Sequence, residues 1–159
     1  MAYGETWAQR YGLTNNRVFF RKNLHDHIRN FEGYRGINNY RFIRLADVLL
    51  MYAECLNATG GTTNAYQYVN KVRTRAGLAN LPSGLTQSAF LTQIKHERLL
   101  ELTGEGHRFN DLKRWGDLGP SLKTKDPGFN NFQIGKHELL PIPQRELDIN
   151  PNMKQNPEW

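Results

Sequence analysis

Residues 97–116 read ERLLELTGEGHRFNDLKRWG: a charged helix end, a Gly-x-Gly break, and a second short helix that mixes charges with an aromatic residue. Glycine favours the left-handed backbone found at helix ends, so the break predicts a sharp turn between two helices. Such dense charge beside leucine and tryptophan indicates either a catalytic cluster or a lattice of buried ion pairs. We expect a structural lattice, built from Glu97, Arg98, Glu101, Arg108, Asp111 and Arg114.

A carboxylate-based glycoside hydrolase is the alternative for these acids. Two carboxyl groups that flank a sugar bond would suffice, and Glu97 with Glu101, or Glu105 with Asp111, could supply them. The neighbouring arginines favour charged carboxylates, however, whereas a general acid must keep its proton. Arg108 is expected to return its guanidinium across the glycine turn and form two hydrogen bonds to a carboxylate.

The same stretch carries part of a metal-site pattern. The sequence around His96 begins like a zinc-protease motif, but Leu100 stands where the second histidine is required. Basic side chains beside the acids would compete with a metal for the same oxygens. We therefore expect no metal and no cofactor, although a bridged site could draw on Glu97, Glu101, Glu105 and His107.

Composition narrows the class of protein. The chain has 159 residues with 38% apolar content, enough for one domain with one core. The net charge is +6, but the basic residues are scattered and aromatics are not interleaved with them, so we expect no nucleic-acid partner. Cys55 is the only cysteine and is expected to be a small core residue. No apolar run approaches the ~18 residues of a membrane span, which predicts a soluble chain.

Hydrophobic periodicity predicts four helices. The first begins after Tyr40, is apolar on most of its circumference and ends at Gly60. The second starts with Thr63 as its N-cap and stops before Gly77, so the pair forms a hairpin about as long as one tetratricopeptide unit. The third and fourth span residues 86–102 and 108–115.

The two ends of the chain have weaker patterns. Residues 1–39 form an irregular lead-in, which places the domain at 40–159. Six of the seven prolines lie from Pro120 onward, so the tail is predicted to be turns and extended chain. Its apolar residues are expected to anchor it around the helical body: Leu139, Leu140, Ile142, Leu147, Ile149, Met153 and Trp159.

Four sequence motifs, taken in their order along the chain, indicate a protein family. They are RLADVLLMYAE at 44–54, YVNKVRTRAG at 68–77, the stretch 97–116, and LLPIPQREL at 139–147 followed by Asn-Pro and Gln-Asn-Pro. In this order they resemble the C-terminal part of the SusD/RagB family of outer-membrane nutrient-binding lipoproteins of Bacteroidetes. Residues 1–39 match the family much less clearly.

The resemblance implies a mainly α fold of tetratricopeptide-like helix pairs with a long irregular tail wrapped on them. It also implies a binding protein and not an enzyme, which takes a glycan or other nutrient at the cell surface and delivers it to a SusC-like TonB-dependent transporter. The lipid anchor of the family is absent from this chain, which would be a soluble C-terminal fragment of an outer-membrane protein.

Few ligand-contacting residues can be assigned on this basis. In the family the motif residues are scaffold, and many sugar contacts come from the N-terminal portion. The aromatics to watch here are Trp7, Tyr11 and Tyr34. Besides the hydrolase, a tetratricopeptide-type adaptor that binds a peptide in a helix groove remains an alternative. The nutrient stays open among starch, mucin glycans, plant polysaccharide and peptide.

Overall fold

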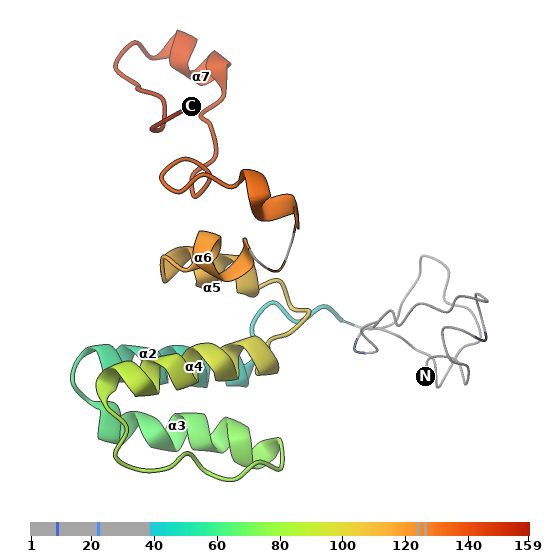
Figure 1. Cartoon of the computed structure of the whole chain (residues 1–159), viewed down its shortest axis with the longest axis vertical. Helices are drawn as coiled ribbons and strands as arrows, with labels where there is room; N and C mark the ends of the chain where they lie inside the picture. The colour runs from blue at the N-terminus through green and yellow to red at the C-terminus, as the bar shows by residue number, and fades with distance from the viewer. Residues whose placement is uncertain (1–8, 10–21, 23–38, 124, 126) are drawn as a thin grey trace. The chain divides into compact units, whose positions relative to one another are not determined.

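The computed structural model describes residues 9, 22, 39–123, 125 and 127–159. Every regular element in these residues is a helix, which confirms the mainly α prediction (Figure 1). The chain divides into two compact units, Met1–Phe90 and Leu91–Trp159, and the division falls within helix α4 (Gln87–Glu101). The predicted domain start at residue 40 coincides with the edge of the described residues and stays a prediction.

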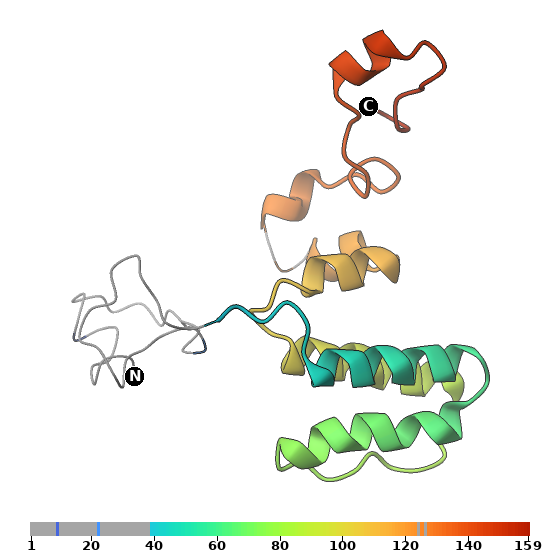
Figure 2. The same ribbon diagram turned by 180° about the vertical axis from the view of Figure 1, so that it is seen from behind.

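The first unit contains a helical hairpin. Helices α2 (Leu45–Ala58) and α3 (Thr62–Arg75) pack against each other across a short turn, as Figures 1 and 2 show from opposite sides. Gly60 ends α2 with a φ of 84°, a conformation that disfavours side chains with a Cβ. The predicted hairpin is therefore present, and its buried apolar residues are Ala46, Leu50, Ala53, Ala65, Val69 and Val72.

Two local predictions for this hairpin are wrong. Thr63 lies inside the first turn of α3, and the N-cap is Gly61, which makes no side-chain cap. The turn is so tight that a Cβ on Gly61 would lie 3.1 Å from the Leu56 carbonyl oxygen, so the helix starts directly after the glycines. Cys55 is exposed, because the buried side of α2 runs through positions such as Leu50 and Ala53.

The opposite side of α2 is also apolar, as its sequence predicts. Leu45, Val48 and Tyr52 are 66%, 44% and 48% exposed. Their spacing of three and four residues places them on one face of the helix. The hairpin thus buries one apolar face of α2 and leaves the other at the surface.

A segment without helix or strand, which we call the strap (residues 78–85), returns along α3 before α4 begins (Figure 2). Arg73 Nε donates to the Ala79 carbonyl (2.7 Å), and the Leu81 amide donates to Asn70 Oδ1 (2.9 Å). The Leu85 amide donates to the Tyr66 hydroxyl at 2.9 Å. Three side chains of α3 therefore form hydrogen bonds with the backbone of the strap, which has no strand partner among the described residues.

The second unit holds the end of α4 and a series of short helices. These are α5 (Arg108–Arg114), α6 (Leu118–Leu122), the 3-10 helix η1 (Pro127–Asn131) and α7 (Gln144–Ile149). The predicted helices at 86–102 and 108–115 are confirmed within one residue or so. No helix in the described part of the chain is long and apolar enough to cross a membrane.

The prediction of turns and extended chain for the tail missed three of these short helices. Each has a proline at or near its start: Pro120 in α6, Pro127 in η1 and Pro143 as the N-cap of α7. Proline is tolerated there because the first amides of a helix have no partner within it. Helices of five or six residues are also too short to show a 3.6-residue period.

Hydrogen bonds from a polar side chain connect distant parts of the tail, whereas two of its expected apolar anchors are exposed. Gln155 Nε2 donates to the Ile142 carbonyl at 2.9 Å, and the Ile142 amide donates back to Gln155 Oε1 at 2.8 Å. Leu140 and Ile149, expected as anchors, are 82% and 66% exposed. The wrapping of the tail on the helices stays a prediction.

Candidate functional site

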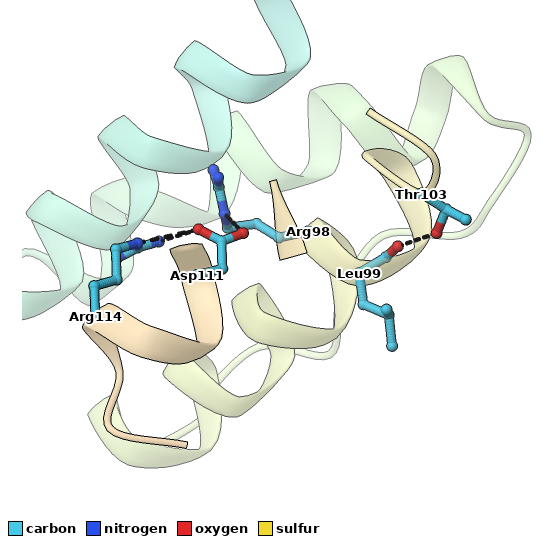
Figure 3. Close-up of polar contacts among 5 residues, drawn as sticks. All are labelled: Arg98, Leu99, Thr103, Asp111 and Arg114. Carbon is cyan, nitrogen blue, oxygen red and sulfur yellow. Dashed lines mark hydrogen bonds and ion pairs between the residues drawn. The ribbon is translucent and has the colours of Figure 1, made fainter. Parts of the chain in front are cut away.

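The charged residues of the second unit meet at Asp111. Arg98 Nε, near the end of α4, donates to Asp111 Oδ2 at 2.8 Å, and the two side chains are only 3% and 6% exposed. Arg114 binds the other oxygen, with Nη2 3.0 Å and Nε 3.1 Å from Asp111 Oδ1 (Figure 3). We call these three residues the Asp111 cluster. Both carboxylate oxygens are therefore bonded to guanidinium groups.

Local structure aims these side chains at one another. Asp111 lies in the first turn of α5 and Arg114 in its last turn, so they are three residues apart on one face. The chain reaches α5 from α4 through Gly104 and Gly106, which have φ values of 78° and 82°. The Thr103 hydroxyl donates to the Leu99 carbonyl and closes the last turn of α4 (Figure 3).

The other residues of the predicted lattice occupy different positions. Glu97 is buried, and its Oε1 accepts a hydrogen bond from Gln93 Nε2 at 2.7 Å. Glu101 is half-buried at the end of α4. Within the described residues Arg108 forms no ion pair, so the expected return of its guanidinium to a carboxylate is wrong. Arg98 and Arg114 already occupy both oxygens of Asp111.

This geometry determines what the cluster can do chemically. A buried carboxylate bonded to two guanidinium groups is held in one orientation and has no free oxygen directed at a substrate. Among the described residues, no three His, Cys, Asp or Glu side chains come together in a way that could hold a metal ion. The arrangement is that of a structural fastening between α4 and α5.

A second buried polar group was missed by the sequence prediction. Asn57 is 2% exposed, and its Nδ2 donates to the Gln87 carbonyl at 3.0 Å. Gln87 Nε2 donates to the Asn57 carbonyl at 2.6 Å, and the Thr62 hydroxyl donates to Asn57 Oδ1 at 2.8 Å. We call these three residues the Asn57 junction, which ties together one end of α2, α3 and α4. A lone amide before two glycines offers no visible signal for this role.

Aromatic residues are candidate sugar contacts, because apolar ring faces stack on sugars. Trp7, Tyr11 and Tyr34, the aromatics chosen from the sequence, lie outside the described residues. The Trp115 ring has the Arg114 guanidinium 4.6 Å and the Lys95 ammonium 5.2 Å from its centroid. The Trp115 ring therefore already contacts two cations within the chain.

Most other described aromatics are also engaged. Trp159 lies under Lys136 Nζ at 4.8 Å, and its indole N–H donates to the Lys136 and Leu139 carbonyls. Ring pairs with centroids 4.7, 4.6 and 5.5 Å apart are formed by Tyr52–Tyr68, Tyr66–Phe90 and Phe129–Phe132.

The pair Tyr40 and Phe42 differs from the rest in its exposure. The two side chains are 60% and 81% exposed, and their ring centroids lie 4.9 Å apart at an interplanar angle of 76°. Phe109 is the other phenylalanine with a largely open ring, at 49% exposure. Among the described residues, the pair therefore presents the most accessible aromatic surface.

Comparison with known sequences identifies the relatives of the chain. A family model described as the SusD family matches residues 2–159. SusD-like protein P25 of Formosa agariphila is 44% identical over 120 residues, which cover 72% of this chain and 23% of that protein. SusD-like protein P2 of the same organism is 37% identical over 136 residues, covering 78% and 26%. The chain thus spans about a quarter of the length of the curated relatives it matches.

Solved structures agree with these relatives. A SusD superfamily protein from Bacteroides vulgatus superposes with a TM-score of 0.71 at 37% identity, over 82% of this chain and 30% of that protein. A laminarin-binding SusD-like protein superposes with a TM-score of 0.58 at 42% identity, over 74% of this chain and 22% of that protein. With the family match along nearly its whole length, the chain belongs to the SusD family.

Proposed function

We propose that this chain is part of a cell-surface lipoprotein that captures an oligosaccharide and passes it to a SusC-like TonB-dependent transporter in the outer membrane. The observation that carries the proposal is the SusD family match over residues 2–159. A laminarin-binding relative at 42% identity adds support for a glycan as the ligand. The described helices would then form a scaffold that holds the ligand-binding loops of the whole protein.

The state of the acidic residues supports binding without catalysis. Glycoside hydrolysis needs one carboxyl group that donates a proton and a second that attacks or activates water. Asp111 has both oxygens bonded to arginine, and Glu97 is 3% exposed and bonded to Gln93. These acids are poorly placed to meet a sugar bond, so the hydrolase alternative loses its best candidates.

The strap weighs against the peptide-binding adaptor. A peptide in a helix groove would need helix side chains that are free to bond to it. On α3, Tyr66, Asn70 and Arg73 already bond to the backbone of the strap. These side chains of the hairpin therefore already bind a segment of the chain itself.

Titration by NMR with laminarin oligosaccharides, beside starch, mucin and plant oligosaccharides, tests the proposal. We expect millimolar binding, equivalent to about −4 kcal/mol, because much of the ligand site should come from other parts of the whole protein. Chromatography of the sugars after long incubation should show no cleavage. Cleavage, or binding of peptides without binding of any glycan, would contradict the proposal.

The transfer step needs a separate test. The whole lipoprotein, tagged and expressed in its own cell, should co-purify with a TonB-dependent transporter from detergent-solubilised outer membranes. Recovery of the lipoprotein without such a transporter, under conditions that preserve other membrane complexes, would contradict the transfer while leaving glycan binding intact.

A further inference from the structure

A turn in the C-terminal tail, which we call the tail turn (residues 133–139), is closed by a histidine ring. The Gln133 amide donates to His137 Nδ1 at 2.8 Å, and the His137 amide donates to the Gln133 carbonyl at 3.0 Å. A neutral imidazole has one nitrogen that donates and one that accepts, so this bond makes Nδ1 the acceptor and places the proton on Nε2. His137 therefore closes the turn only while its ring is neutral.

Aromatic neighbours hold the His137 ring in this position. Its centroid lies 5.6 Å from that of Phe132 and 5.6 Å from that of Trp159. The Trp159 indole N–H donates to two carbonyls of the tail turn at 3.1 Å each, and Lys136 Nζ lies 4.8 Å from the indole centroid. Trp159 follows Glu158, whose φ of 65° is rare for a residue with a Cβ and persists only where surrounding contacts hold it.

No carboxylate of the described residues is bonded to the His137 ring. Glu138 is next in sequence, but its Oε2 accepts a hydrogen bond from the Gly135 amide at 2.8 Å. Glu158 forms no ion pair within the described residues, and helix η1, which ends just before the turn, contains no titratable side chain. A proton gained by the ring would therefore meet no bonded anion, and Lys136 already places one positive charge on the same tryptophan.

We propose that the tail turn is a pH-sensitive device that opens when His137 gains a proton. Histidine is the side chain whose charge ordinarily changes between about pH 5 and 8. Protonation converts Nδ1 from an acceptor into a donor, which then faces the N–H of Gln133 and cannot bond to it. The closed turn thus binds fewer protons than the open turn, so its stability is present at the upper end of this range and is lost as the pH falls. No ligand takes part, so the inference does not depend on the proposed function.

NMR of the whole chain at about pH 8 and about pH 5, the limits of the histidine range, tests this. At the higher pH, the nitrogen shifts of the His137 ring should show the proton on Nε2. The protection of the Gln133 amide against solvent exchange, corrected for the intrinsic pH dependence of exchange, should fall about fivefold at the lower pH. This is the loss expected for one neutral hydrogen bond.

His137→Asn is the matched variant, because asparagine Oδ1 occupies the place of Nδ1 along the side chain and accepts without gaining a proton in this range. The variant should protect the Gln133 amide equally at both pH values. His96→Asn removes an exposed histidine of α4 and serves as the control. It should keep the fall in protection seen in wild type.

Four results would overturn the inference. They are a proton on Nδ1 at the higher pH, equal protection of Gln133 at both pH values in wild type, a pH dependence that persists in His137→Asn, and its loss in His96→Asn. If His137→Asn leaves the amide unprotected at both pH values, the imidazole is shown to be the acceptor, and the wild-type comparison then decides between a pH-sensitive and a pH-independent turn.

Discussion

The Asn57 junction and the Asp111 cluster both connect helix ends through a buried polar side chain, but they use different chemical groups. Each centres on a polar side chain that is almost completely buried, Asn57 in the first and Asp111 in the second, and each joins helix ends: α2, α3 and α4 in the first, and α4 and α5 in the second. The junction uses only neutral groups, and its amide both donates and accepts. The cluster uses a carboxylate that can only accept and guanidinium groups that can only donate.

This difference should decide how each fastening fails. Removing one partner of a buried ion pair leaves an uncompensated charge away from water, whereas removing a neutral partner leaves only an unsatisfied donor or acceptor. The Asp111 cluster should therefore be the more fragile of the two, although it has fewer bonds between separate elements.

The largest effect is expected for Arg98→Ala. The change leaves Asp111 buried with only the half-exposed Arg114 as partner, and should cost about 3–5 kcal/mol of unfolding free energy. Arg98→Lys should recover part of this, since an ammonium keeps the charge but not the planar guanidinium geometry. Urea melts of the three proteins give the comparison. Coincident midpoints would show that the cluster does not stabilise the fold.

Asn57→Ala should cost less, about 1–3 kcal/mol, because it leaves neutral groups of Gln87 and Thr62 without their partner. Asn57→Asp is the matched variant, with the same shape but without the donor to the Gln87 carbonyl. It also adds a buried charge, so it should destabilise more than alanine does. If Asn57→Ala costs as much as Arg98→Ala in the same urea melts, the distinction between neutral and charged fastenings is wrong.

Tyr66→Phe measures the contribution of a single neutral hydrogen bond. It removes one hydroxyl that accepts from the Leu85 amide and keeps the ring packed on Phe90. A loss of about 0.5–1.5 kcal/mol is expected from a single neutral hydrogen bond. Hydrogen exchange should also quicken at the Leu85 amide. Unchanged exchange there would mean that this bond does not hold the strap on α3.

The smallest effect is expected for Arg114→Ala. This arginine binds the same aspartate as Arg98, but its side chain is 42% exposed, so water replaces much of what is lost. We expect less than about 1 kcal/mol, and a smaller value still at high salt. Thermal melts at low and high salt test this. A loss of stability equal to that of Arg98→Ala would show that the exposed fraction of the two arginines does not determine how much each stabilises the fold.

The helices and the presence of a charged cluster were predictable because both depend on local order in the sequence. Apolar residues at three- and four-residue spacing determine where α2, α3 and α4 form, and glycines at positions such as 60 and 104 mark their ends. The four motifs at 44–54, 68–77, 97–116 and 139–147, taken in this order, also indicated the SusD/RagB family, which the family match confirms.

Partner choice was decided only by tertiary structure. Several arginines lie close to Asp111 in sequence, and only the packing of α5 after α4 brings Arg98 to its buried oxygen and leaves Arg108 unpaired within the described residues. Asn57 and Gln87 are thirty residues apart and carry no charge, so nothing in their local pattern links them. Helix formation depends on neighbours along the chain, whereas hydrogen-bond partners depend on which helix ends meet in space.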